Sequence, residues 1–153
     1  MRKSPLKRKA GSKETSGRKK KPSISSLKKK CWKVFSLYIR RKYADPITGH
    51  ASCVTCGVSK HYKELQAGHI VPGRGNSILF DERGVFPQCY ACNCCNHGAI
   101  HEYIDFMKKH YGEEKGREII EDLRDKSRNE RKSFTVEELE WLIRDYQIRT
   151  GNA

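Results

Sequence analysis

The sequence predicts an α+β fold in which a small metal-stabilised core of β-hairpin and helix is flanked by N- and C-terminal helices. Two Cys-x-x-Cys pairs, Cys53/Cys56 and Cys89/Cys92, enclose residues 57–88. Short β-type runs lie between the pairs, and helical periodicity marks the segments on both sides. A chain of 153 residues has room for one modest domain plus tails.

Residues 1–26 form an arm rich in Lys, Arg, Ser, Gly and Pro. Residues 1–30 carry thirteen basic residues and one acidic residue, so they hold +12 of the net charge of +14. Too few apolar side chains are present to offset the entropy of ordering, so we expect the arm to be disordered. A polycation binds polyanions, DNA before an anionic membrane, with Lys19, Lys20 and Lys21 as candidate DNA contacts. The alternatives are a solubilising tail and a nuclear import signal.

A first helix is predicted from Ser25 or Ser26 to about Tyr43, where Asp45-Pro46 begins a turn. Its apolar positions follow helical spacing: Leu27, Cys31, Val34, Phe35, Tyr38 and Ile39. We expect the folded domain that follows the arm to span residues 27–149.

The centre of the chain is predicted as a cysteine turn followed by a hairpin. The turn covers residues 52–57, and β signals follow at Gln66–Val71 and Val85–Pro87. The Gly-rich segment 72–76 separates them.

Three helices are predicted in the C-terminal half. One starts near Ala91–Asn93 and runs to about Tyr111, and the others cover 113–127 and 135–149. Thr135 and Glu138 form a capping box for the last helix. The C-terminal helices could form a homodimer, or they could pack on their own domain.

The four paired cysteines predict a structural Zn²⁺ site. Each Cys-x-x-Cys turn brings two thiolates to one ion, and two turns complete a tetrahedron. The ion would close the hairpin between the pairs and contribute free energy of folding. Cys95 could replace Cys89, because Cys92 and Cys95 have the same spacing, but Cys89 is preferred. The other cysteines, Cys31, Cys94 and Cys95, are expected to be free thiols.

The cysteine content also bears on location. No apolar run reaches the roughly 20 residues that span a bilayer, and no apolar segment follows Met1, so we expect no membrane association, no secretion and a reducing interior. An odd number of cysteines, seven, in such an interior favours metal ligation over disulfides.

A second group of residues suggests phosphodiester hydrolysis. A His on a strand, a Gly-rich loop and then a helix with metal ligands is the order of elements in ββα-metal (HNH) nucleases. His69 is the candidate general base, because an imidazole suits proton abstraction at neutral pH. Arg74, in the Gly-rich loop, is the candidate phosphate contact, and Arg83 is a second one.

The same chemistry needs a divalent cation, Mg²⁺ or Mn²⁺, to stabilise the leaving oxygen. Asn93 and His97, one turn apart on the predicted helix, could bind it from one face. His101, a further turn along, is a third ligand or merely a neighbour. The competing hypothesis is a non-catalytic, zinc-stabilised DNA-binding module in which His69 is structural.

Taken together, these segments resemble the NinG family of lambdoid phages, also called Rap. The matching segments span about residues 27–149: Val34-Phe35-Ser36, Tyr38-Ile39-Arg40, Ala44-Asp45, 53–57 (CVTCG), 66–70 (QAGHI), 80–83 (FDER), 88–93 (QCYACN), His97-Gly98 and Glu102-Tyr103. The resemblance implies a phage-encoded, metal-dependent endonuclease that cuts Holliday junctions and D-loops in the bacterial cytoplasm. By the same resemblance, His69 falls on the Gly-His motif, and Asn93 and His97 fall on the segment after the second cysteine pair.

Two positions depart from the family pattern, since Gly84 and Ala99 stand where the family has Asn. Loss of the first Asn could weaken activity, or it could pass the orientation of the base to a backbone carbonyl. Gly68 stands where HNH enzymes often have an Asp ligand, with Asp81 or Glu82 as possible substitutes.

Overall fold

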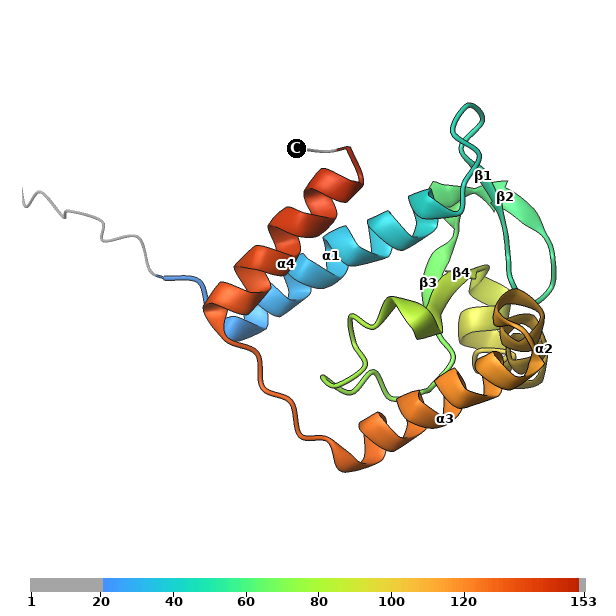
Figure 1. Cartoon of the computed structure of the whole chain (residues 1–153). Helices are drawn as coiled ribbons and strands as arrows, with labels where there is room; N and C mark the ends of the chain where they lie inside the picture. Colours follow the sequence, from blue (N-terminus) through green and yellow to red (C-terminus); the bar gives the residue numbers. More distant parts are fainter. Residues whose placement is uncertain (1–20, 152–153) are drawn as a thin grey trace, which may run out of the picture.

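The strands form two separate antiparallel ribbons in the computed structural model, which describes residues 21–151 (Figure 1). The first ribbon pairs β1 (His50–Ser52) with β2 (Ser59–His61), and the first cysteine turn lies between them. The second pairs β3 (Gln66–His69) with β4 (Val85–Gln88). The predicted β signals are confirmed as a hairpin, whereas β1 and β2 are additional.

The β3–β4 ribbon positions both candidate sites. Its register places Gln66 opposite Gln88 at one end and His69 opposite Val85 at the other. The second cysteine pair begins directly after Gln88, so the Gln66/Gln88 end faces the cysteines. The His69/Val85 end faces helix α1.

Helices α1 (Ile24–Lys42) and α4 (Val136–Arg149) lie side by side (Figure 1). Buried side chains of the two helices pack with those of the second ribbon in one cluster: Phe35, Tyr38, Ile39, Ala67, Val85 and Tyr146. The predicted capping box is confirmed, since Thr135 Oγ1 accepts a hydrogen bond from Glu138 N (3.1 Å) and Glu138 Oε2 accepts one from Thr135 N (2.8 Å). One face of α4 is therefore occupied within its own chain.

The start of α1 corrects the predicted boundary of the arm. Ser23 caps the helix by accepting a hydrogen bond from Ser26 N (3.2 Å), so the helix begins at Ile24. The last residues of the predicted 1–26 arm are therefore helical. Residues 1–20 of that arm, with Lys19 and Lys20, lie outside the described residues.

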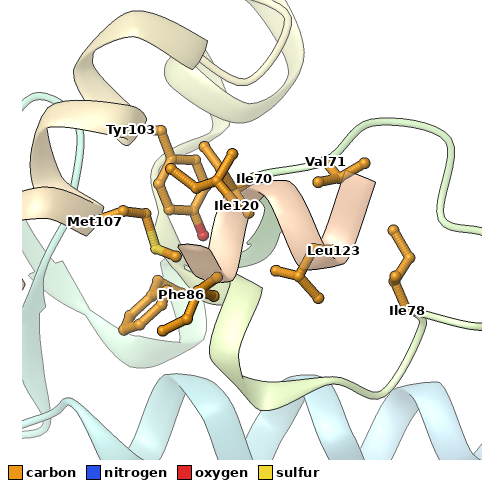
Figure 2. Close-up of a cluster of buried hydrophobic side chains, with 9 residues drawn as sticks. Ile70, Val71, Ile78, Phe86, Tyr103, Met107, Ile120 and Leu123 are labelled. Atoms are coloured by element: carbon orange, nitrogen blue, oxygen red, sulfur yellow. The ribbon is translucent and has the colours of Figure 1, made fainter. Parts of the chain in front are cut away.

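Helices α2 (Ile100–Tyr111) and α3 (Glu113–Asn129) form a second packed layer beside the ribbon. Gly116 allows their close approach, because a Cβ there would lie 2.8 Å from both Lys108 Cα and Met107 O. Figure 2 shows the core that they close: Ile70, Val71, Ile78, Phe86, Tyr103, Met107, Ile119, Ile120 and Leu123. Each such side chain contributes roughly 1.5–3 kcal/mol by leaving water.

The predicted continuous helix from Ala91–Asn93 to Tyr111 is wrong. A short π-helical turn, Ala91–Cys95, is followed by a break at His97, Gly98 and Ala99, whose φ angles are +49°, +90° and +47°. Gly98 N–H donates to Cys92 O (2.9 Å), which folds the chain back around the second cysteine pair. Closing that turn is incompatible with a helix running through it, so α2 starts afresh at Ile100.

Among the residues that the structure describes, no helix is both long enough and apolar enough to cross a membrane.

Candidate metal centre and candidate active site

Two turns bring the four paired cysteines together into one cluster. The Sγ atoms of Cys53, Cys56, Cys89 and Cys92 all lie within 4.8 Å of one another, and those of Cys56 and Cys89 are 3.8 Å apart. Zinc–sulfur bonds of about 2.3 Å give a tetrahedron with edges of about 3.8 Å. The cluster could therefore hold a metal such as zinc. Cys95 is exposed and outside it.

Backbone hydrogen bonds hold each cysteine turn in place. In the first turn, Cys53 N donates to Val58 O (2.9 Å) and Gly57 N donates to Cys53 O (2.8 Å), with Gly57 at φ +77°. A glycine suits this left-handed conformation. The first turn is also tied to the second ribbon, because Val54 N donates to Pro87 O (3.0 Å). The cysteine positions are thus fixed by the fold itself.

The ionisation of the thiols favours a cation at this cluster. Burial opposes ionisation of Cys53, but hydrogen bonds from the Thr55 hydroxyl and nearby backbone amides lower the pKa of its thiol to about 6. Burial, with the neighbouring sulfurs of Cys89 and Cys56, raises the pKa of Cys92 to about 12. Four thiolates packed this closely need a positive charge between them, which is the charge that Zn²⁺ would supply.

His69 lies at the other end of the ribbon, partly buried, with its ring fixed on two sides. Its Nε2 lies 3.1 Å from Leu79 O, and its ring stacks on Trp32 with centroids 5.3 Å apart and an interplanar angle of 18°. A carbonyl oxygen only accepts, so Nε2 carries the proton and Nδ1 is left as the acceptor. Burial lowers the pKa of His69 to about 4, helped by the charge of Arg74 and opposed by the bond to Leu79. The imidazole is therefore neutral at pH 7.

Arg74 lies over the same tryptophan, with its guanidinium carbon 4.0 Å from the centre of the Trp32 ring. Within residues 21–151 no carboxylate pairs with Arg74. A cleft of about 500 Å³ opens beside it, lined by Ser25, Lys28, Lys29, Trp32, Arg74 and Leu79. The candidate base thus lies next to a basic cleft.

Arg83, the second predicted phosphate contact, differs from Arg74 in its partners. Its guanidinium donates to Asp81 (2.9 and 2.6 Å) and to Asp122 (2.8 Å), and these bonds raise its pKa. Its charge is therefore neutralised by two carboxylates. Asp81 is held by this interaction, and Glu82 is held by Lys42 (3.2 Å) and Arg149 (2.7 Å). Lys21, the described residue of the basic trio, is exposed ahead of α1.

The residues predicted to bind a catalytic cation do not share a helix face. His97 is exposed in the chain break, and His101 is exposed on α2. Asn93 instead faces β3, where its Nδ2 donates to Gln66 Oε1 (2.6 Å). Among the described residues, the four cysteines are the one group of three or more His, Cys, Asp or Glu that could hold a metal. The continuous helix predicted to carry Asn93, His97 and His101 is therefore wrong, whereas cation binding by these residues stays a prediction.

The side chain of Gln88 explains the glycine before the candidate base. A Cβ at Gly68 would lie 1.9 Å from Gln88 Oε1 and 3.0 Å from Asn93 Oδ1, so an Asp there has no room. Gln88 Nε2 donates to Gly98 O (2.8 Å), which ties the ribbon to the chain break. Its Oε1 is the one buried side-chain N or O atom of the described residues without a hydrogen-bond partner.

Sequence reasoning missed Trp32 and Leu79, which contact His69, and Lys28 and Lys29, which line the neighbouring cleft. The two lysines and Trp32 were assigned only to the first helix, and Leu79 lies in an irregular loop. Their partners are distant in sequence, so no local spacing marks them. The one available signal was an aromatic residue among Lys residues at the start of a helix.

Comparison with known proteins gives one match. Residues 2–153 match the family model described as bacteriophage lambda NinG protein. The chain has no match among curated proteins or among solved structures. Because the family model covers almost the whole chain, this protein belongs to the bacteriophage lambda NinG family.

Proposed function

We propose that this protein is a metal-dependent DNA endonuclease that hydrolyses phosphodiester bonds in branched recombination intermediates, such as Holliday junctions and D-loops, in the cytoplasm of a phage-infected host. The observation that carries the proposal is a neutral, oriented His69 beside a basic cleft whose Arg74 has no carboxylate partner among the described residues. Membership of the NinG family supports the phage setting.

His69 would act as the general base. With its Nε2 proton bound by Leu79 O, its Nδ1 is free to take a proton from water. A pKa of about 4 keeps that nitrogen unprotonated at neutral pH, and it also makes the imidazole a weaker base than one that titrates near neutral pH. The Leu79 carbonyl thus takes the orienting role that an Asn has in related nucleases. Gly84 is no obstacle to this arrangement, because its own environment is the packing against Leu123 and Ile70.

Arg74 would bind the phosphate, since its planar guanidinium can donate two parallel hydrogen bonds to phosphate oxygens. Lys28 and Lys29 add positive charge along the same cleft. Such contacts bind any phosphodiester and carry no sequence information. Preference for branched DNA must therefore come from another feature of the site.

The proposal includes two metals with different roles. Zinc at Cys53, Cys56, Cys89 and Cys92 would stabilise the scaffold. A Mg²⁺ or Mn²⁺ ion would stabilise the leaving oxygen when bound. The residues that the structure describes do not form a complete site for the second ion. Asn93 is its best candidate ligand, because its Oδ1 lies close to β3 one residue before His69.

A cleavage assay tests the proposal. A labelled four-way junction and a linear duplex of the same sequence are incubated with the protein in Mg²⁺, Mn²⁺ or EDTA. We expect ion-dependent cleavage of the junction, and a loss of roughly 10²–10⁴-fold in rate for His69→Ala. The matched control is His101→Ala, which removes an exposed histidine of α2 and should cleave normally. Zinc content and junction affinity should be unchanged in both variants.

A non-catalytic, zinc-stabilised DNA-binding module is the second candidate. The stacking of Trp32 on His69, and the separation of Asn93 from His97 and His101, favour it. Junction binding without cleavage in any of the three conditions would establish this candidate and refute the nuclease.

A further inference from the structure

Trp32 occupies a central position in the basic cleft. It contacts the candidate base through ring stacking and the candidate phosphate contact through a cation–π interaction. Its indole is only partly buried, and it comes from α1, whereas both of its partners come from the β3 strand and the loop after it. An aromatic face at this place is available to a ligand whenever Arg74 moves away.

The cleft has the size and charge for part of a nucleic acid strand. About 500 Å³ is within the range of small-ligand sites. Its charged lining is entirely basic, and Lys28 is held in place by Asn76 Oδ1 (2.8 Å). A positively charged groove combined with a partly exposed aromatic ring such as Trp32 resembles the arrangement with which proteins bind unpaired nucleotides, by phosphate contacts and base stacking.

The Arg74–Trp32 contact is one that a phosphate can displace. A guanidinium over a partly exposed ring is held less strongly than one that makes charge-assisted bidentate bonds to a phosphate. Arg74 has φ +47° and lies between Gly73 (φ +96°) and Gly75, so its backbone can change conformation at little steric cost. A phosphate that binds Arg74 therefore exposes the indole beside it.

We propose that Trp32 is a stacking platform for an unpaired base next to the cleaved bond. In this inference, which rests on the proposed function, Arg74 leaves the indole to bind the phosphate, and the base of the adjoining nucleotide takes its place near His69. Continuous duplex offers no unstacked base, whereas a branch point does. Trp32 would thus supply the preference for branched DNA that phosphate contacts lack.

Fluorescence of Trp32 tests the platform directly. The chain has two tryptophans, so Trp141→Phe, at an exposed position of α4, leaves Trp32 as the one indole reporter. This variant is titrated in buffer without added Mg²⁺ or Mn²⁺, with a four-way junction, the same junction with abasic sites at the branch point, a linear duplex and polyphosphate. We expect the intact junction to quench Trp32 and the abasic junction to bind about tenfold more weakly without that quenching.

Matched variants separate stacking from folding. Trp32→Phe keeps an aromatic face and should retain most of the difference between intact and abasic junctions, whereas Trp32→Leu should lose it while keeping zinc content and helical circular dichroism. Arg74→Ala should weaken polyphosphate binding and keep the quenching by unpaired bases.

Equal affinity for the intact and abasic junctions, or equal quenching by polyphosphate and the junction, would refute the platform. These binding measurements need no cleavage. Cleavage without base-dependent quenching would therefore refute the stacking role of Trp32 but not the nuclease activity. Base-dependent quenching without cleavage would refute the nuclease activity but not the stacking role.

Discussion

The two ends of the β3–β4 ribbon are built by different kinds of contact. At the Gln66/Gln88 end, the cysteine pairs approach within 4.8 Å of one another, each held by a tight turn. At the His69/Val85 end, the candidate base is held by an aromatic ring and a backbone carbonyl, and the charge of Arg74 lies nearby. The first end suits a fixed scaffold, because a bound metal would link its four cysteines. The second suits a site that opens, because its contacts are weak and exchangeable.

The comparison also separates two arginines. Arg83 is tied to Asp81 and Asp122, whereas Arg74 contacts only the Trp32 ring among the interactions of the described residues. An arginine with two carboxylate partners stabilises the fold at the cost of its availability to DNA. An arginine without them keeps its charge for a phosphate.

The largest expected effect comes from breaking the cysteine end. Cys53→Ser removes one of four ligands, so we expect loss of the bound zinc and a fall of more than about 4 kcal/mol in the free energy of unfolding. Cys95→Ser is the matched control, since that thiol is exposed and outside the cluster. Metal analysis after dialysis and urea unfolding give the two readouts. A Cys53→Ser protein with full zinc and wild-type stability would mean that the cluster is not a metal site.

The next effect concerns the His69 end and depends on pH. Burial lowers the pKa of folded His69 from 6.5 to about 4, so acid protonates the unfolded chain first and favours unfolding. The stability that depends on neutral His69 is complete above pH 6.5 and is lost as the pH falls to about 4. The difference between the pKa values of 6.5 and about 4 corresponds to roughly 3 kcal/mol in the free energy of unfolding.

His69→Gln cannot titrate, so its stability should fall less than that of the wild type between pH 6.5 and 4.5, with both proteins referenced to pH 7.5. Protonation of the cysteines affects both equally. The measurement is the free energy of unfolding in urea at each pH. Parallel curves for the two proteins would show that His69 is solvated in the folded state.

A smaller loss is expected from introducing at position 84 the Asn that the sequence pattern led us to expect there. In Gly84→Asn the new Cβ would lie 2.5 Å from Leu123 Cδ1 and 3.0 Å from Ile70 Cγ2, so we expect a loss of about 2 kcal/mol from overpacking. The same change in a Leu123→Ala background should cost much less, because the clash is removed. Urea unfolding of the four proteins of this cycle gives the coupling. Additive effects would show that position 84 does not pack on α3.

The cysteine end was predictable because its information is local. Cys-x-x-Cys spacing specifies a turn, and Thr135 with Glu138 specifies a helix start, so each prediction needs only a few neighbouring residues. The β3 and β4 runs were also readable from sequence. The strands β1 and β2 were not, because His50–Ser52 and Ser59–His61 are short and polar.

The His69 end was less predictable because its information is tertiary. No pattern links Trp32 to His69, and the Leu79 carbonyl is a backbone group that every residue has. The break before α2 was missed for another reason. Of its three left-handed residues, only Gly98 carries a sequence signal, while His97 and Ala99 adopt that conformation against their intrinsic preference.

The smallest expected effect returns to this break, at the second position where the family has Asn. Ala99 has φ +47° and ψ +56°, a conformation that Asn adopts more readily than Ala. Ala99→Asn should therefore raise the free energy of unfolding by roughly 0.5–1 kcal/mol and leave zinc content unchanged. Ala91→Asn is the control, since that exposed alanine has a negative φ and should gain nothing. If both variants gave the same stability, the left-handed turn between the cysteine cluster and α2 would not exist in solution, and a helix running through Asn93, His97 and His101 would again be tenable.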